Sequence, residues 1–168
     1  MGLRVRSNSN HIRSMDPRES TVSNALNNPN EIFDYFYKII VIGDEGVGKT
    51  NFLLRIAKNV YDPNPKQTYG VEFLFRTMPL PNSNQKVKAQ IWDTSGSKDF
   101  LDITTTHYRF AVGAFIVYDV TNRKSFLNLK DWLYKVKEYS DRAVVIALIG
   151  NKADLVDREE GLFGFSKQ

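Results

Sequence analysis

The sequence predicts an α/β fold in which a mostly parallel central sheet carries helices on both faces. Short apolar runs, typical of buried strands, alternate along the chain with segments of helical periodicity. The first of these runs ends in a glycine-rich turn that is followed by a helix. With 168 residues, the chain is long enough for one domain of this kind.

The first half of the chain predicts three strands and a helix. Tyr37 to Ile42 is an apolar run that ends in glycine, as expected of a buried strand. Val71 to Met78 and Lys86 to Trp92 predict two more strands. The loop 79–85 between them carries prolines and asparagines that suit an antiparallel connection. The helix after the first strand has apolar residues at helical spacing: Leu53, Ile56, Ala57 and Val60.

The second half predicts two further buried strands, Ala111 to Asp119 and Val144 to Ile149. An amphipathic helix lies between them, and Ser125 is a candidate for its N-cap. The apolar face of this helix consists of Phe126, Leu129, Leu133 and Val136.

Residues 1–34 differ in character from the rest. They are rich in Asn, Ser and Arg and show no apolar periodicity, so they cannot bury enough surface to offset their ordering entropy. We therefore expect a disordered N-terminal tail, followed by one domain over residues 35–168.

Composition excludes several function classes. The chain has no cysteine, which rules out disulfides, thiolate metal sites and a lipidated C-terminal cysteine. The net charge of +4 is dispersed and provides no basic run of the kind that binds nucleic acid. No segment approaches the roughly 18 apolar residues of a membrane span. We expect a cytoplasmic protein without a lipid anchor, which reaches membranes through partners.

Residues 43–50 match the pattern G-x-x-x-x-G-K-[ST] in full, between a predicted strand and a predicted helix. In such a phosphate loop, glycines let backbone N–H groups surround phosphates, and the helix N-terminus adds partial positive charge. Lys49 is expected to reach the β- and γ-phosphates of a nucleotide, and the Thr50 hydroxyl to bind Mg²⁺. The predicted nucleotide contacts here are Glu45, Gly46, Val47, Gly48, Lys49, Thr50 and Asn51.

A second motif, Asp93-Thr94-Ser95-Gly96, ends the strand that contains Trp92. A carboxylate at Asp93 suits the role of holding Mg²⁺ through water. Gly96 leaves room for a backbone N–H to meet a γ-phosphate. The alternative is an ordinary exposed turn.

A third motif, Asn151-Lys152-Ala153-Asp154, follows the last predicted strand. Since ligands of open α/β sheets bind at the carboxyl ends of strands, this motif and the phosphate loop share one edge. The Asp154 carboxylate can accept hydrogen bonds from N1 and N2 of guanine, a donor pair that adenine lacks. Taken alone, the motif also fits a polar turn at a strand end.

Together these motifs resemble the Ras superfamily of small GTPases, and more narrowly the Rab family, over residues from about 35 to 156. The phosphate loop, Thr68, the Asp93–Gly96 motif and the Asn151–Asp154 motif occur in the order of that family. The Rab character rests on Tyr69-Gly70-Val71-Glu72-Phe73, Ala89-Gln90-Ile91-Trp92, His107-Tyr108-Arg109 and Val117-Tyr118-Asp119-Val120-Thr121.

The resemblance implies further roles. Thr68 would bind Mg²⁺ and γ-phosphate in the GTP state, and would act with Lys49 and Gly96 in catalysis. Tyr61 would pack against the guanine, and Lys152 would lie along the base. Two loops would be held by γ-phosphate and Mg²⁺ and released after hydrolysis.

The resemblance also implies protein partners. Phe73, Trp92 and His107 match an aromatic triad that Rab proteins present to effectors, and exchange and activating proteins would bind the switch regions. The alternative for these side chains is plain core packing.

Three departures from the family pattern matter. Ser97 stands where the family has the glutamine that orients the attacking water, so we expect slow GTP hydrolysis. Glu45 stands in the phosphate loop where the family has a small residue, and it either blocks an arginine finger or attracts one. We also expect the domain to lack the last strand and helix of the family fold, which would leave apolar surface exposed.

The leading hypothesis is a GTP- and GDP-binding switch that uses Mg²⁺, hydrolyses GTP slowly and has a Rab-like role in vesicle trafficking. The alternative is a Rab-like interaction scaffold that does not hydrolyse GTP, or a truncated product. An adenine-specific kinase is disfavoured by Asp154 and by the lack of a lid-like arginine cluster.

Overall fold

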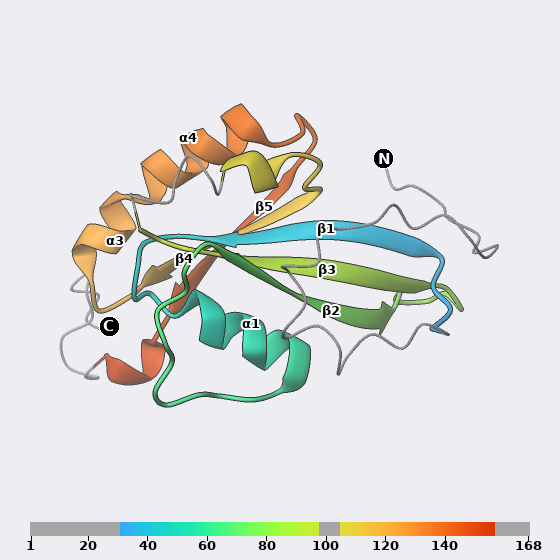
Figure 1. The fold of residues 1–168 in the computed structure, drawn as a ribbon, viewed down its shortest axis with the longest axis horizontal. Coiled ribbons are helices and arrows are strands. Elements are labelled where there is room, and N and C mark those ends of the chain that lie inside the picture. Colours follow the sequence, from blue (N-terminus) through green and yellow to red (C-terminus); the bar gives the residue numbers. More distant parts are fainter. Residues whose placement is uncertain (1–30, 98–104, 157–168) are drawn as a thin grey trace, which may run out of the picture.

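The computed structural model describes residues 31–97 and 105–156. Five strands form one sheet in the order β2-β3-β1-β4-β5, which confirms the predicted fold class (Figure 1). The strands are β1 (Tyr35–Ile42), β2 (Val71–Pro79), β3 (Lys86–Thr94), β4 (Gly113–Asp119) and β5 (Val145–Asn151). The helices are α1 (Lys49–Lys58), α3 (Arg123–Leu127) and α4 (Leu129–Tyr139), with short 3₁₀ turns η4 (Thr106–Tyr108) and η5 (Ala153–Leu155).

The sheet is parallel except at one edge. β1 lies between β3 and β4 and runs parallel to both, and β5 continues the parallel set beyond β4. β2 pairs antiparallel with β3 from Val71 opposite Thr94 to Pro79 opposite Lys86, as the loop between them predicts. The carboxyl ends of β1, β3, β4 and β5 therefore share one edge, where the predicted motifs lie.

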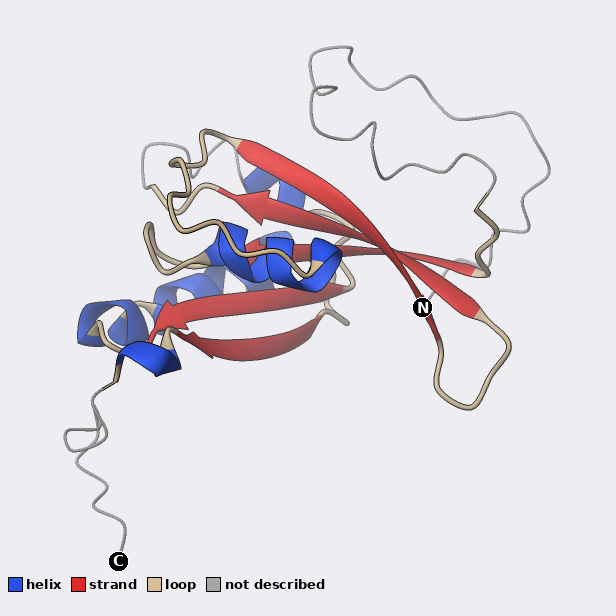
Figure 2. Cartoon of the chain, turned by 90° about the horizontal axis from the view of Figure 1, so that it is seen from below, coloured by secondary structure: helices blue, strands red, loops and turns tan. Residues whose placement is uncertain are grey.

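Helices cover the two faces of the sheet, with α1 on one and α3 and α4 on the other (Figure 1). Alternate residues of β1 divide between the two layers. Val41 packs in the cluster that contains Leu53 of α1, whereas Ile40 and Ile42 pack with Trp132 of α4. Figure 2 shows the sheet from below, with α1 lying across it and the β2–β3 hairpin extending beyond the helix.

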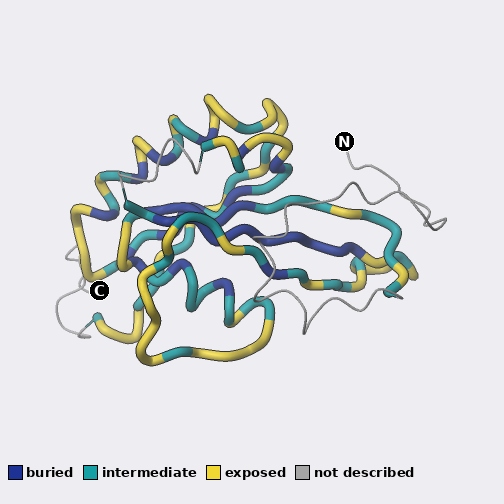
Figure 3. The backbone as a smooth tube through the Cα atoms, viewed as in Figure 1, coloured by how far each residue is buried: buried dark blue, intermediate teal, exposed yellow. Residues whose placement is uncertain are grey.

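Burial is greatest in the middle of the sheet, and the outer side of α4 is exposed (Figure 3). At the β5 edge, Val145 and Leu148 are 72% and 58% exposed. No helix within the described parts of the chain has both the length and the apolar character needed to cross a membrane.

Three details of the predicted elements were wrong. The first helix ends at Lys58 because Asn59 adopts the left-handed conformation that closes helices, so Val60 lies outside it. Ala111 precedes β4 and donates its N–H to the Tyr108 carbonyl in a turn. The N-cap of α3 is Asn122, whose side chain accepts from the N–H groups of Lys124 and Ser125.

The predictions for the two ends of the chain fall mostly outside the described residues. Of the predicted tail, only residues 31–34 are described, and they run beside β3. Asp34 N–H donates to the Lys86 carbonyl at 2.9 Å, and Glu31 pairs with Lys88 at 3.5 Å. The domain boundary at residue 35 stays a prediction.

Candidate functional site

The phosphate loop joins the carboxyl end of β1 to α1. Gly48 is the N-cap of α1 and has a φ of 93°, a region that favours glycine. A Cβ at this position would lie 2.4 Å from the side-chain nitrogen of Asn151. That nitrogen donates to the Val47 carbonyl at 2.8 Å, so the end of β5 is packed directly against the loop. Two motifs more than one hundred residues apart thus form one surface.

Lys49 places a buried ammonium group against the loop. Its side chain is 6% exposed, and Nζ donates to the Asp44 carbonyl at 2.8 Å. Burial lowers the pKa of Lys49, and three nearby carboxylates, those of Asp93, Asp44 and Glu45, oppose that shift. Among the described residues, this buried cation has one hydrogen-bond acceptor, which suits it to binding an anionic ligand such as a phosphate group.

Two threonine hydroxyls converge on the Asp93 carboxylate at the end of β3. Thr50 Oγ1 donates to Asp93 Oδ2 at 2.5 Å, and Thr68 Oγ1 lies 2.9 Å from the Thr50 hydroxyl. Asp93 is 1% exposed, and its other oxygen, Oδ1, has no hydrogen-bond partner in the described structure. Such an oxygen is costly to bury without a ligand.

These residues fit a magnesium ion. Mg²⁺ prefers one or two carboxylates, with its remaining ligands drawn from hydroxyls, water and phosphate oxygens. The cluster supplies one carboxylate and two hydroxyls. Among the described residues, no three His, Cys, Asp or Glu side chains group together. A Mg²⁺ ion held by this cluster would take its remaining ligands from water and a bound phosphate.

The burial of Asp93 predicts that the stability of the protein depends on pH. Burial raises its pKa from 3.8 to about 6, although the Thr50 hydrogen bond opposes the shift. Between these values the folded chain binds a proton that the unfolded chain releases, so this group makes the free energy of unfolding fall as pH rises. In metal-free, nucleotide-free protein, Asp93→Asn should remove that contribution. Urea unfolding at pH 4.5 and pH 7 measures it, and an equal pH dependence in both proteins would contradict it.

The end of β5 forms a polar surface beside the phosphate loop. Lys152 Nζ donates to the Gly46 carbonyl at 2.8 Å and pairs with Asp119 Oδ2 at 2.7 Å. Burial opposes ionisation of Asp119, but hydrogen bonds from Lys152 and Thr121 outweigh it and lower the pKa of Asp119. The Lys152 side chain is thereby fixed between the phosphate loop and the end of β4.

All of the predicted nucleotide contacts except Val47 line two adjoining cavities, and the Val47 side chain is buried in the core instead. One, of about 270 Å³, is lined by Lys49, Thr50, Thr68 and Gly96 together with other residues of the phosphate loop. The other, of about 530 Å³, is lined by Tyr61, Asn151, Lys152 and Asp154. Gly48 and Asn51 line both, so a ligand with phosphates in the first cavity can extend into the second. The Asn51 side chain also pairs with the backbone of Asp62 at 2.9 Å.

Comparison with known proteins agrees with this geometry. The sequence model of the Ras family matches residues 38–162. The chain belongs to the Ras family. It is 48% identical over 124 residues to the GTP-binding protein ypt3 of Schizosaccharomyces pombe, covering 74% of this chain and 57% of that protein. It is also 48% identical over 123 residues to the Ras-related protein RABA1b of Arabidopsis thaliana, covering 73% and 56%.

This Ras-family chain is also similar to the Ras-related protein Rab11B of Nicotiana tabacum. The two are 46% identical over 123 residues, which cover 73% of this chain and 56% of that protein. These relatives confirm the predicted place of the chain as a Rab-like member of the Ras superfamily. The chain spans a little over half the length of the curated relatives it matches.

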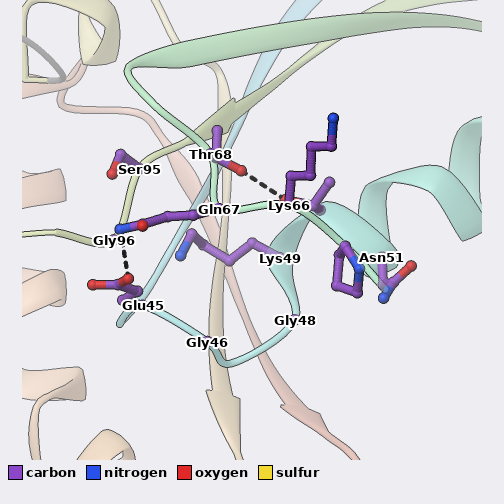
Figure 4. Close-up of a pocket in the computed structure, with 12 residues that line it drawn as sticks. Glu45, Gly46, Gly48, Lys49, Asn51, Lys66, Gln67, Thr68, Ser95 and Gly96 are labelled. Carbon is purple, nitrogen blue, oxygen red and sulfur yellow. Dashed lines mark hydrogen bonds between the residues drawn. The ribbon is translucent and has the colours of Figure 1, made fainter. Parts of the chain in front are cut away.

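One contact of the Ras-family site was not predicted from the sequence. Gln67, next to Thr68, donates from Nε2 to Glu45 Oε1 at 2.6 Å and so joins the loop between α1 and β2 to the phosphate loop. Figure 4 shows the Gln67 side chain extending across the cavity toward Glu45 and Gly96. Sequence reasoning missed Gln67 because no family motif includes it. Glu45 therefore has a partner within the chain.

A second unpredicted contact anchors the phosphate loop to α4. Asp44 Oδ2 accepts from Asn128 Nδ2 and Asp44 Oδ1 from Trp132 Nε1, both at 2.7 Å. The two donors stand four positions apart on adjoining turns, so both can reach one carboxylate. Both carboxylate oxygens are satisfied, and the loop is held against the helix.

Removing one of these donors should destabilise the fold modestly. Asn128→Ala deletes one hydrogen bond to a half-buried carboxylate, so we expect the free energy of unfolding to fall by about 1–2 kcal/mol. Urea unfolding of the variant and the wild type measures this change in the free energy of unfolding. Asn84→Ala, in the exposed β2–β3 turn, is the control and should change stability by less than about 0.5 kcal/mol. Equal stability of the two variants would show that water replaces the lost amide.

The predicted aromatic triad is contiguous in the Ras-family fold. The ring centroids of Phe73 and Trp92 lie 5.0 Å apart, and those of Trp92 and His107 lie 5.1 Å apart. Trp92 is 6% exposed, whereas Phe73 and His107 are half-buried. The outer members thus have surface available for a partner, and Trp92 belongs to the core.

Proposed function

We propose that this chain is a guanine-nucleotide switch that binds GTP and GDP with Mg²⁺ and hydrolyses GTP slowly to GDP and phosphate. The observation that carries the proposal is the convergence of three motifs at one sheet edge. Lys49 and the loop amides face one cavity, the Asp93 cluster borders it, and Asp154 lines the adjoining one. The names of the relatives support it, since ypt3 is a GTP-binding protein.

Each group has a role in this proposal. Lys49 binds the β- and γ-phosphates, and the Gly96 N–H binds the γ-phosphate. Thr50, Thr68 and Asp93 hold Mg²⁺, which when bound neutralises the charge of the phosphate oxygens. Tyr61 and Lys152 flank the base, and Asp154 accepts the guanine N1 and N2 hydrogens. These assignments rest on the cavity linings and on the family's pattern.

Slow hydrolysis follows from Ser97. A serine side chain is too short to place a hydrogen-bonding group on the attacking water as a glutamine does. In the structure, Ser97 N–H donates to the Ser95 hydroxyl at 3.3 Å, so its backbone is directed into the local turn.

The wider role belongs to the same proposal. We place a Rab-like domain over residues 35–168, with residues 1–34 as a tail. Effectors and exchange and activating proteins bind the switch regions, including the half-buried Phe73 and His107 that flank the buried Trp92, and take the chain to membranes in vesicle trafficking. The Rab and Ypt names of its relatives support this role.

One experiment tests the proposal. Nucleotide released from the purified chain is identified by chromatography, and phosphate release from bound GTP is then followed in a single turnover. We expect guanine nucleotide and slow turnover. Guanine nucleotide without turnover favours the alternative, a Rab-like scaffold, and the absence of guanine nucleotide contradicts both.

A variant links the slow rate to its proposed cause. Ser97→Gln should raise the single-turnover rate by about tenfold, because it restores a carboxamide that can orient water. Ser83→Gln, in the exposed β2–β3 turn, makes the same change far from the cavity and should leave the rate unaltered. An unchanged rate in Ser97→Gln would disprove the assigned cause.

A further inference from the structure

Gln67 brings a carboxamide to the corner of the phosphate cavity where Ser97 provides none. It precedes Thr68, whose hydroxyl lies in the Asp93 cluster, so its backbone is placed by that cluster. Its side chain then extends toward Glu45 and Gly96 (Figure 4) and lines the same cavity as Lys49. The chain therefore presents a glutamine at this cavity from a different loop.

The position of Gly96 shows that the two loops meet at one corner. Gly96 packs so closely on the phosphate loop that a Cβ there would lie 2.4 Å from the Glu45 nitrogen and 2.6 Å from the Gly43 carbonyl. Residue 97 therefore starts beside Glu45. Since Gln67 Nε2 is 2.6 Å from the Glu45 carboxylate, its carboxamide reaches the corner from the opposite side.

Glu45 determines which end of the Gln67 amide faces the cavity. An ionised carboxylate only accepts hydrogen bonds, so it engages the Nε2 donor and leaves Oε1 as the free end. Within the described residues, Glu45 is the one hydrogen-bond partner of this amide. Both side chains are exposed, so water has access to Oε1. A carbonyl oxygen held in place beside a phosphate site can accept a hydrogen bond from an attacking water.

We propose that Gln67 is a catalytic residue that orients the attacking water in GTP hydrolysis, and that Glu45 is a positioning residue that holds its carboxamide. The inference rests on the proposed function. The water oxygen forms a bond to the γ-phosphorus, and the bond from that phosphorus to the β–γ bridging oxygen breaks. The water proton leaves with the released phosphate, and GDP is the other product.

Single-turnover hydrolysis and nucleotide affinity, measured on the same full-length variants, test this role. Gln67→Ala should lower the hydrolysis rate by about tenfold, because a misplaced reactant is costly, while the affinities for GDP and GTP stay within about twofold. Glu45→Gln should give a smaller fall, since its amide can hold Gln67 in either orientation. Asn84→Ala removes an exposed carboxamide in the β2–β3 turn and should change neither quantity.

A rescue separates catalysis from a structural effect. Adding Ser97→Gln to Gln67→Ala should restore the rate to at least the wild-type value, because a carboxamide again reaches the same corner from its other side. If both glutamines supply the same group, Ser97→Gln should raise the rate by a larger factor in the Gln67→Ala protein than in wild type. If Gln67→Ala only loosens the loop, Ser97→Gln should raise the rate by the same factor in both backgrounds.

Several outcomes would overturn the inference. These are an unchanged or faster rate in Gln67→Ala, a fall in affinity that accounts for the loss of rate, and failure of the rescue. Wild-type protein that binds guanine nucleotide but shows no hydrolysis would overturn it while leaving nucleotide binding intact. Failure to bind guanine nucleotide at all would instead identify the proposed function as the error.

Discussion

Replacing Lys49 with alanine is expected to weaken the binding of GDP and GTP by about 10²-fold. Lys49 is 6% exposed, and its ammonium group has one acceptor in the described structure, the Asp44 carbonyl at 2.8 Å. Its charge is therefore available to phosphate oxygens in a poorly hydrated setting, where Coulomb attraction is strong. A hydrogen bond to a charged group contributes roughly 1.5–3 kcal/mol, which corresponds to about 10–100-fold in affinity, and Lys49 would contact two phosphates.

Titration of a fluorescent guanine nucleotide measures this effect. Lys58→Ala is a matched control, because Lys58 is the last residue of the same helix and is exposed. It should leave the affinity within about twofold, since exposed charges at a distance are screened by salt. Equal affinities of the two variants would show that the loop binds phosphate through its backbone alone.

The second large expected effect is on the recognition of the guanine base. Asp154→Asn should weaken GTP binding by about 10²-fold or more, because a site built to pair polar groups rejects a ligand that leaves them unpaired. In the proposed complex, the aspartate would accept from both N1–H and the exocyclic amine of guanine. An asparagine accepts one of these bonds but turns an N–H toward the amine. Xanthine has a carbonyl in place of that amine, so the variant should gain affinity for xanthosine nucleotides.

Competition between guanosine and xanthosine diphosphates for the site measures this change in base preference. Asp154 is exposed on η5 and forms part of the cavity lining, so the substitution should not disturb the core. Asp141→Asn, at an exposed position after α4, makes the same chemical change away from the cavity and should keep the guanine preference. If Asp154→Asn binds guanosine nucleotides as well as wild type does, Asp154 is not the group that selects the base.

The strands β1, β4 and β5 were predictable because each is a mainly apolar run between breaking residues. Tyr37 to Ile42 was predicted as a strand, and β1 spans Tyr35–Ile42. Burial on both faces demands apolar side chains at every position, which makes such strands visible in the sequence. The end of α1 was less predictable, because Val60 continues the apolar spacing although the left-handed Asn59 has already closed the helix.

The candidate site also has parts that the sequence predicts and parts that it does not. Glycines, Lys49, Asp93 and the Asn151–Asp154 motif stand directly at strand ends, so parallel topology alone brings them to one edge. Their places follow from local spacing plus one rule of sheet geometry. The sequence by itself therefore determined the fold class, the phosphate loop and the strand ends that border the site.

Only the tertiary structure decided which side chains join these motifs. Gln67 meets Glu45 across 22 residues, and Asn128 and Trp132 meet Asp44 across 84 and 88 residues. None of the three donors belongs to a motif, and a hydrogen bond depends on distances of a few tenths of an ångström that spacing does not encode. The phosphate loop was readable because its function resides in backbone conformation. Its side-chain partners were not, because they depend on how separate loops and helices pack against it.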